Sequence, residues 1–281
     1  MPQGPNAQYN VAAPGSLPVR IAARARRRMY ERFLAGTGIS EDETLLDVGA
    51  TSDRTYESSN YVAAWYPYKH RITAVGIDDA SFLEDRYPGL TFVRADGREL
   101  PFESCSFDVV HSSAVLEHVG GAADQRRFIG ELARVARRAV FLTTPNRWFP
   151  VEFHTVLPFV HWLPRPTFRR LLGGTRYAFF ADEANLNLLG RRDLLRLCGG
   201  LAGWDVRVEP LRLWGLSSNL LLTLRRPEGG AARRSADADE NEAGGQRVGQ
   251  HGSAERGGDE GGRVGERAED RVERKTVAQG E

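Results

Sequence analysis

The chain has 281 residues, of which 41% are hydrophobic and 9% aromatic, enough to build the core of a domain. Its formal net charge of +1 argues neither for nor against a nucleic-acid partner. The two cysteines, Cys105 and Cys198, lack the spacing of metal ligands or of a disulfide framework, so the sequence predicts no metal site. It shows neither an apolar signal core nor an apolar run of about 20 residues, and we therefore expect a cytoplasmic protein.

The two ends of the chain differ in composition from its middle. Residues 1–16 are rich in Pro, Gly and Asn, which is typical of a disordered arm. Residues 227–281 mix Gly, Arg, Glu and Asp and contain no aromatic residue, so they bury too little apolar surface to offset the entropy of ordering. We expect a disordered tail there, and one folded domain over residues 17–226.

The folded part begins with a basic segment, PVRIAARARRRMYERFLAG. Its apolar residues Ala22, Ala25, Met29 and Phe33 recur at helical spacing. The arginines around them would suit a phosphate-bearing acceptor or an anionic membrane surface. A solvated helix that packs on the domain is the simpler interpretation.

Strand-like and helix-like segments then alternate. Five short apolar runs are bounded by turn residues, as expected for strands covered on both faces: ETLLDVG, ITAVGID, LTFVRAD, FDVVHSS and AVFLTTP. A helical pattern, AADQRRFIGELARVARR, separates the last two, and the helix-like LLGRRDLLRLCGG precedes two final strand-like segments. This order predicts an α/β fold with a Rossmann-like, doubly wound, mostly parallel seven-stranded sheet.

Acidic and small polar residues close four successive strands of this predicted sheet. A doubly wound sheet binds its ligand at the carboxyl ends of its strands. A single acid there could merely cap a helix or a turn, but acids after three strands in order indicate a ligand site. In strand order the closing residues are Asp47 with Gly49, Asp78 with Asp79, Asp96 with Gly97, and His111 with Ser112 and Ser113.

The loop after the first strand, within LLDVGATSD, narrows the choice of ligand. Gly49 allows close approach to the backbone, and an acid such as Asp78 after the second strand can accept hydrogen bonds from both ribose hydroxyls. A dinucleotide site would need G-x-G-x-x-G, which is absent, and Asp53 would repel a pyrophosphate. The predicted ligand therefore has a ribose and no phosphate, and S-adenosylmethionine meets that description.

Four segments together resemble the ordered motifs of class I S-adenosylmethionine-dependent methyltransferases of the type 11 group: LLDVGATSD, AVGIDD, FVRADGRELPFESCSFDVVHSSAVLEHV and RVARRAVFLTTPN. The resemblance covers about residues 44–146. It departs from the family in the first loop, where Thr51 and Asp53 replace the later glycines. It implies S-adenosylmethionine as cofactor and the following cofactor-binding residues: Asp47, Gly49, Thr51, Asp78, Asp79, Asp96, Gly97, Ser112 and Ser113.

Methyl transfer needs a base only if the acceptor must lose a proton. We expect His118 to be that base, with Glu117 orienting its ring, although each histidine could instead be structural. Five further residues are expected near the acceptor: Tyr56, His111, Asn146, Glu152 and His154.

Residues 146–172 form an insert rich in aromatic residues and prolines, after the strand end where an acceptor should lie. It is either a lid or acceptor pocket, or a packed connection. The predicted function is methyl transfer to a small-molecule, glycan or lipid-linked acceptor, with peripheral membrane contact. The alternative is a non-catalytic cofactor-binding or scaffolding relative. A nucleic-acid methyltransferase is disfavoured, because HSSA is not an N/D-P-P-Y/F tetrad. The sequence indicates neither the acceptor atom nor the oligomeric state.

Overall fold

The computed structural model describes residues 17–227, so the predicted arm and all but the first residue of the predicted tail lie outside the described residues. Within this range, seven strands form one sheet in the order β3-β2-β1-β4-β5-β7-β6. The strands are β1 (Leu45–Val48), β2 (Ile72–Gly76), β3 (Thr91–Arg94), β4 (Phe107–Ser113), β5 (Ala136–Pro145), β6 (Asp205–Leu213) and β7 (Leu216–Arg225).

The first five strands run parallel, whereas β7 is antiparallel to both of its neighbours, β5 and β6. The chain first builds outward from β1 to β3 and then returns to place β4 on the other side of β1. This return creates a switch point between β1 and β4, where a doubly wound sheet opens a crevice at its carboxyl edge. The predicted Rossmann-like, mostly parallel sheet is confirmed.

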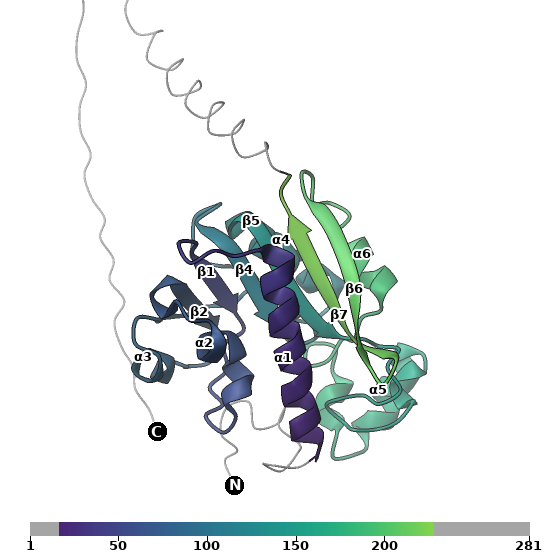
Figure 1. The fold of residues 1–281 in the computed structure, drawn as a ribbon. Coiled ribbons are helices and arrows are strands. Elements are labelled where there is room, and N and C mark those ends of the chain that lie inside the picture. The colour runs from purple at the N-terminus through teal and green to yellow at the C-terminus, as the bar shows by residue number, and fades with distance from the viewer. Residues whose placement is uncertain (1–16, 228–281) are drawn as a thin grey trace, which may run out of the picture. The chain divides into compact units, whose positions relative to one another are not determined.

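Helices cover both faces of the sheet (Figure 1). They are α1 (Leu17–Thr37), α2 (Tyr61–Trp65), α3 (Phe82–Arg86), α4 (Ala122–Val135), α5 (Arg165–Gly173) and α6 (Arg191–Leu197). Residues of α1, α2 and α3 share one core cluster, and residues of α4 and α6 share another. Neighbouring strand residues therefore enter different cores, as Leu45 and Leu46 do, because side chains alternate across a strand.

The connection from β5 to α6 occupies residues 146–190 and runs on past the predicted insert boundary at residue 172. We call residues 146–190 the insert. It holds α5 and has a small core of its own, formed by Phe168, Leu172, Phe180, Leu186 and Leu188. Among the described residues, no helix is both long enough and apolar enough to cross a membrane. The cytoplasmic location stays a prediction.

Candidate functional site

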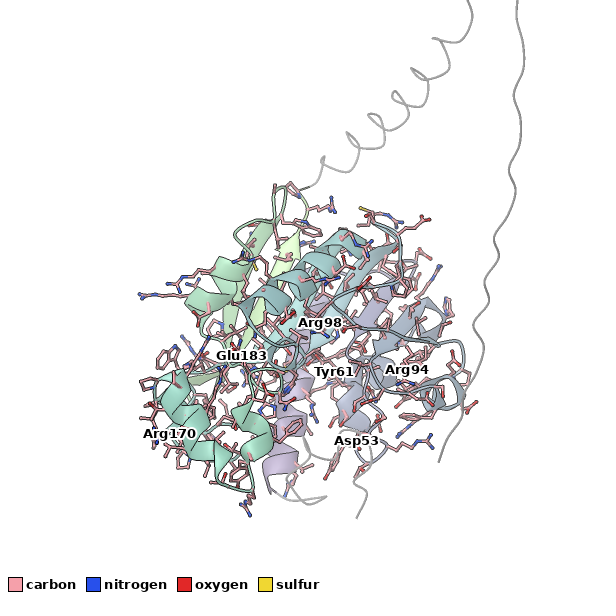
Figure 2. The ribbon with its side chains drawn as sticks, turned by 180° about the vertical axis from the view of Figure 1, so that it is seen from behind. Asp53, Tyr61, Arg94, Arg98, Arg170 and Glu183 are labelled. Atoms are coloured by element: carbon pink, nitrogen blue, oxygen red, sulfur yellow. The ribbon has the colours of Figure 1, made fainter. Side chains whose placement is uncertain are left out.

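A cavity of about 750 Å³ opens at the carboxyl ends of β1, β2 and β4. Segments far apart in sequence line it, including the loop after β1, the loop after β3 and the insert. Figure 2 marks Asp53, Tyr61, Arg98 and Glu183, which these segments and α2 bring to the cavity. A space of this size suits a whole small ligand or cofactor.

Gly49 shapes the floor of the cavity. Its φ of 111° lies in the left-handed region, and a Cβ atom there would fall 2.1 Å from Cγ2 of Val115. The amides of Gly49 and Ala50 both donate to the Val75 carbonyl at 2.8 Å, which ties the turn to β2. Only glycine fits this position, and its bare backbone is what a ligand would meet.

Side-chain hydrogen bonds fix the rest of the loop after β1, where Thr51 and Asp53 stand in place of the later glycines of the family pattern. The Asn60 amide accepts from the Thr51 amide nitrogen and donates to the Thr51 carbonyl, both at 2.9 Å. The Asp53 carboxylate accepts hydrogen bonds from the Thr55 amide and the Ser59 hydroxyl, each at 2.8 Å. Thr51 and Asp53 both line the cavity. The loop that departs from the family pattern is thus fixed and directed toward the cavity.

The residues that close β2 divide between the cavity and its surroundings. Gly76 and Ile77 line the cavity, whereas Asp78 and Asp79 directly after them do not. Asp79 accepts a hydrogen bond from the Ser81 amide at 2.9 Å, next to the start of α3, and this bond lowers its pKa. Ribose binding by Asp78 stays a prediction.

Asp96 and Gly97, which follow β3, both line the cavity. The Asp96 carboxylate accepts a hydrogen bond of 2.6 Å from Arg98, and this contact lowers the pKa of Asp96. A Cβ atom on Gly97 would lie 2.4 Å from the Phe128 ring, so the backbone passes directly over α4. The loop therefore presents a charged carboxylate beside bare backbone.

Asp47 and His111 form a buried network behind the cavity wall, and neither lines the cavity. They face each other in the β1–β4 register, with His111 Nδ1 2.7 Å from Asp47 Oδ1. The other ring nitrogen of His111 lies 2.8 Å from the Tyr61 hydroxyl. Tyr61 lines the cavity, and burial raises its pKa. In this structure Asp47 and His111 position Tyr61. Cofactor binding by Asp47 and acceptor contact by His111 stay predictions.

The end of β4 turns sharply into the cavity. Ser113 lines it and its hydroxyl lies 2.8 Å from the Thr143 hydroxyl, whereas the buried Ser112 hydroxyl has no partner among the described residues. Ala114, which also lines the cavity, has a φ of 56°. A non-glycine residue in this region stores strain, which is common at functional sites.

Two other residues predicted at the acceptor site lie elsewhere. Tyr56 does not line the cavity. Asn146 donates from its amide to the Ser217 carbonyl and accepts from the Trp148 amide, which fixes the turn where β5 enters the insert. The acceptor-site roles of Tyr56 and Asn146 stay predictions.

Arg26 of α1 lines the cavity, and sequence reasoning missed it. Its guanidinium donates to the Ser58 hydroxyl at 3.1 Å, and burial lowers its pKa although Tyr61 and Asp53 oppose that shift. The signal is its helical phase, four residues after Ala22 and three before Met29, in the otherwise apolar stripe. This half-buried cation lies beside apolar residues of the helix, and Asp53 is an anion near it.

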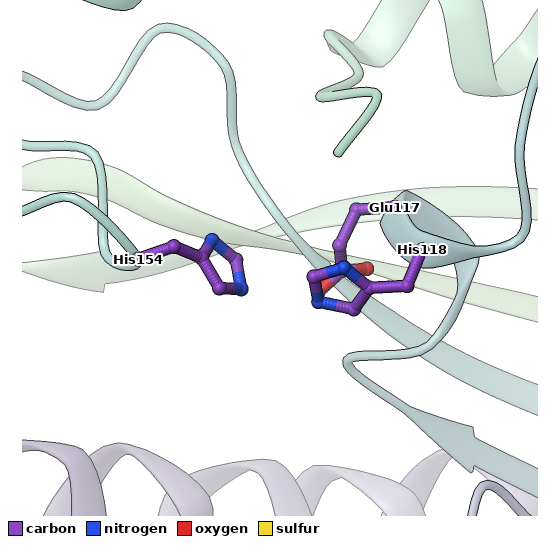
Figure 3. Close-up of side chains that lie close together, drawn as sticks. All are labelled: Glu117, His118 and His154. Atoms are coloured by element: carbon purple, nitrogen blue, oxygen red, sulfur yellow. The ribbon is translucent and has the colours of Figure 1, made fainter. Parts of the chain in front are cut away.

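Glu117, His118 and His154 meet at another part of the cavity (Figure 3). Glu117 and His118 lie on the 3₁₀ turn η4 (Leu116–His118), whereas His154 comes from the insert. Both histidines line the cavity. His154 Nδ1 lies 2.6 Å from Oε1 of the buried Glu152, which supports it from behind. The structure thus brings together three residues that the sequence associated with the acceptor, namely His118, Glu152 and His154.

Burial sets the charges of this group. It raises the pKa of Glu117 to about 7 and lowers the pKa of His118 to about 3, with the charge of His154 acting in the same direction on His118. Burial also opposes ionisation of Glu152 and His154. Their mutual hydrogen bond outweighs it, so the pKa of Glu152 falls to about 2 and that of His154 rises.

Comparison with known proteins agrees with this geometry. Residues 46–143 match the family model of the methyltransferase domain. Two strains of Mycobacterium tuberculosis each have a probable S-adenosylmethionine-dependent methyltransferase that is 37% identical over 81 residues, or 27% of this chain. The match covers 28% of the length of these relatives.

Solved structures share the fold. Magnesium protoporphyrin IX methyltransferase of Synechocystis PCC 6803, with bound SAH, superposes with a TM-score of 0.51 at 16% identity, covering 78% of this chain and 91% of its own. The [4+2]-cyclase SpnF gives the same TM-score and identity, covering 79% and 86%. The family match and the ordered strand-end motifs agree that residues 46–143 form a domain of the class I S-adenosylmethionine-dependent methyltransferase type, and the solved structures show that the surrounding fold is shared.

Proposed function

We propose that this chain transfers a methyl group from S-adenosylmethionine to a small-molecule, glycan or lipid-linked acceptor. The observation that carries the proposal is the arrangement of charge and bare backbone in one cavity. Arg26 and Asp53 interact electrostatically and both line it, so they offer opposite charges to the carboxylate and amino group of the cofactor. Asp96 can accept a hydrogen bond from the adenine amino group.

The glycine positions support the fit of this cofactor. Side chains at Gly49 or Gly97 would collide with Val115 or Phe128, so the backbone is open only because both residues are glycine. When bound, S-adenosylmethionine supplies a methyl group on a positively charged sulfur. The chain's own contribution is to hold the cofactor and acceptor in line and to exclude water.

At the acceptor end, the chain presents electron-rich atoms. His118 Nδ1 donates to the Asn185 carbonyl, which places the lone pair of the neutral ring on Nε2, whereas His154 pairs with the Glu152 carboxylate, which favours its charged form. Nε2 of His118 suits an acceptor hydroxyl that must lose a proton. The expectation that His118 is the base remains part of this proposal.

The exposed surface of the insert favours a lipid-linked acceptor and peripheral membrane contact. Eight large hydrophobic residues are exposed there: Trp148, Phe153, Val156, Phe159, Trp162, Leu163, Leu171 and Phe179. Exposed Arg170 lies on the outer side of the insert, away from the cavity (Figure 2). Exposed apolar and basic residues within one segment suit the boundary of an anionic membrane. Vesicles with anionic lipid should co-sediment with the chain, and neutral vesicles should not.

Calorimetric titration of the full chain with S-adenosylmethionine and S-adenosylhomocysteine tests the function. We expect micromolar binding of both and none of NAD. Asp78→Ala should weaken binding of S-adenosylmethionine by about 1–3 kcal/mol, because a charged hydrogen bond is lost. The control is Asp85→Ala, since Asp85 is exposed on α3. No binding of either compound would overturn the proposal. Binding without turnover across an acceptor screen would favour a non-catalytic relative.

A further inference from the structure

One ligand atom from each of Glu117, His118 and His154 lies within 4.8 Å of the other two. Figure 3 shows the two imidazole rings close together, with the Glu117 carboxylate next to the His118 ring, and the two ring planes are nearly perpendicular. The sequence predicts no metal, because Glu117 and His118 are adjacent and His154 follows far along the chain. Only the folded insert brings the third residue to the other two.

Hydrogen bonds to the far side of each ring fix which nitrogen faces this cluster. A carbonyl oxygen can only accept, so His118 Nδ1 donates to the Asn185 carbonyl at 2.7 Å. His154 Nδ1 likewise donates to the Glu152 carboxylate at 2.6 Å. Nε2 of each ring therefore faces the cluster, and metal binding displaces the Nε2 proton of a charged His154. A carbonyl or a carboxylate behind a histidine is the usual support of a metal-binding imidazole.

Glu117 supplies the third electron-rich atom. Its side chain is fully buried, and its Oε2 accepts a hydrogen bond of 2.9 Å from the Thr144 hydroxyl. Its Oε1 has no hydrogen-bond partner among residues 17–227, and it lies 3.9 Å from Nε2 of His118. A buried carboxylate oxygen without a partner is costly, and a cation within reach relieves that cost.

We propose that Glu117, His118 and His154 bind one divalent transition-metal ion, with Glu152 and the Asn185 carbonyl orienting the two histidines. Two imidazole nitrogens and one carboxylate oxygen suit Zn²⁺, Co²⁺ or Fe²⁺ better than Mg²⁺. Bonds of about 2.0–2.2 Å require the cluster to contract by about 1 Å, which a small rotation of His154 on its loop can provide. Three protein ligands leave a position open toward the cavity.

The role of this ion rests on the proposed function. With the ion bound, His118 Nε2 is a ligand and does not act as the base. An acceptor hydroxyl at the open position would instead lose its proton to solvent, because a bound cation lowers the pKa of a coordinated oxygen. That oxygen then forms the new bond to the methyl carbon. The carbon–sulfur bond breaks, its electron pair stays on sulfur, and S-adenosylhomocysteine leaves.

Metal binding can be measured without cofactor or acceptor. The full chain, stripped with a chelator, is titrated calorimetrically with Zn²⁺ and with Mg²⁺, and Co²⁺ binding is followed through its visible absorption. We expect one equivalent of Zn²⁺ at micromolar affinity or tighter, competition between Co²⁺ and Zn²⁺, and Mg²⁺ binding weaker by at least about 100-fold.

Variants locate the ion. Glu117→Gln keeps the shape of the side chain and its contact with Thr144. Glu117→Gln and His154→Ala should each weaken Zn²⁺ binding about 100-fold or more. Glu152→Gln, which removes the carboxylate behind His154, should weaken it about tenfold. The matched controls His70→Ala, on an exposed residue, and His251→Ala, in the tail sequence, should change nothing. Circular dichroism and S-adenosylhomocysteine binding check that each variant folds.

The outcomes separate the two proposals. Absent Zn²⁺ and Co²⁺ binding, or binding that survives both Glu117→Gln and His154→Ala, overturns the metal site. A chain that binds Zn²⁺ at this cluster and binds no S-adenosylhomocysteine keeps the metal site and loses the proposed function. A chain that binds S-adenosylhomocysteine and does not bind Zn²⁺ would overturn the metal site and leave the proposed methyl transfer unaffected.

Discussion

The sheet edge and the insert hold their functional residues in different ways. At the sheet edge, Gly49 and Asp96 follow strands and Ser113 ends one, and hydrogen-bonded register fixes where each strand ends. In the insert, His154 is held by the side chain of its neighbour Glu152, within backbone that bends through left-handed non-glycine residues. Under the proposed function, the sheet edge binds the cofactor and the insert contacts the acceptor.

The largest expected effect tests whether the insert is an independent unit. Phe168→Ala empties the centre of the insert core and should cost about 3–5 kcal/mol of local stability. Hydrogen exchange should speed up over residues 146–190 only, while S-adenosylhomocysteine affinity falls less than tenfold. Leu171→Ala, on the exposed side of the same helix, is the control. Loss of protection throughout the sheet would show that the two regions unfold together.

At the sheet edge, Gly49→Ala should reduce S-adenosylhomocysteine affinity at least about 100-fold. The added Cβ meets Val115 at 2.1 Å, and the left-handed backbone costs a further 1–3 kcal/mol or so. Gly130→Ala is the matched control, because no atom lies within 4 Å of its Cβ position on α4. It should stabilise the chain by roughly 0.5–1 kcal/mol. Calorimetry and urea unfolding measure both, and an unchanged affinity in Gly49→Ala would refute the close approach.

Arg26→Leu should weaken S-adenosylhomocysteine binding roughly 10- to 100-fold, the value of one charged hydrogen bond. Methylthioadenosine lacks the amino acid portion, so the variant should bind it as the wild type does. The control is Arg24→Leu, on an exposed position of the same helix. Equal losses for both ligands would mean that Arg26 supports the loop through Ser58 and does not bind the carboxylate.

The smallest effect concerns the opposite edge of the sheet. Asp108 accepts hydrogen bonds from the amide and hydroxyl of Thr44 and pairs with Arg137. Burial opposes its ionisation, but these contacts outweigh burial and lower its pKa. Because the folded-state pKa lies below the unfolded value, the stabilisation is complete above the ordinary carboxyl range and is lost as the pH falls through the lowered pKa.

Asp108→Asn should therefore reduce the free energy of unfolding by roughly 1–2 kcal/mol at pH 7. The difference from the wild type should shrink as the pH is lowered from about 5 toward 2. Urea unfolding at each pH measures it. A constant difference across that range would show that the lowered pKa does not link Asp108 to stability.

The sequence predicts those parts of the fold and site that depend on local patterns, and it does not predict those that depend on contacts between distant segments. The strands, their order and the closing acids follow from apolar runs and turn residues, which are local patterns. The pairing of Asp47 with His111 depends on the register between β1 and β4, which local sequence patterns do not predict. Arg26 reaches the cavity only because α1 lies across the sheet, although its helical phase already marks it. His154 depends on irregular backbone for which no periodic pattern exists.

The position of α1 bears on how the protein is made. Arg28 of this helix donates to the Arg212 carbonyl, 184 residues further on, and Arg32 pairs with Glu209. During synthesis α1 leaves the ribosome first, but the strands that hold it arrive last. Helix α1 can pack against α2 and β5 as soon as these have been made, but its contacts with β6 form only at the end of synthesis of the described domain.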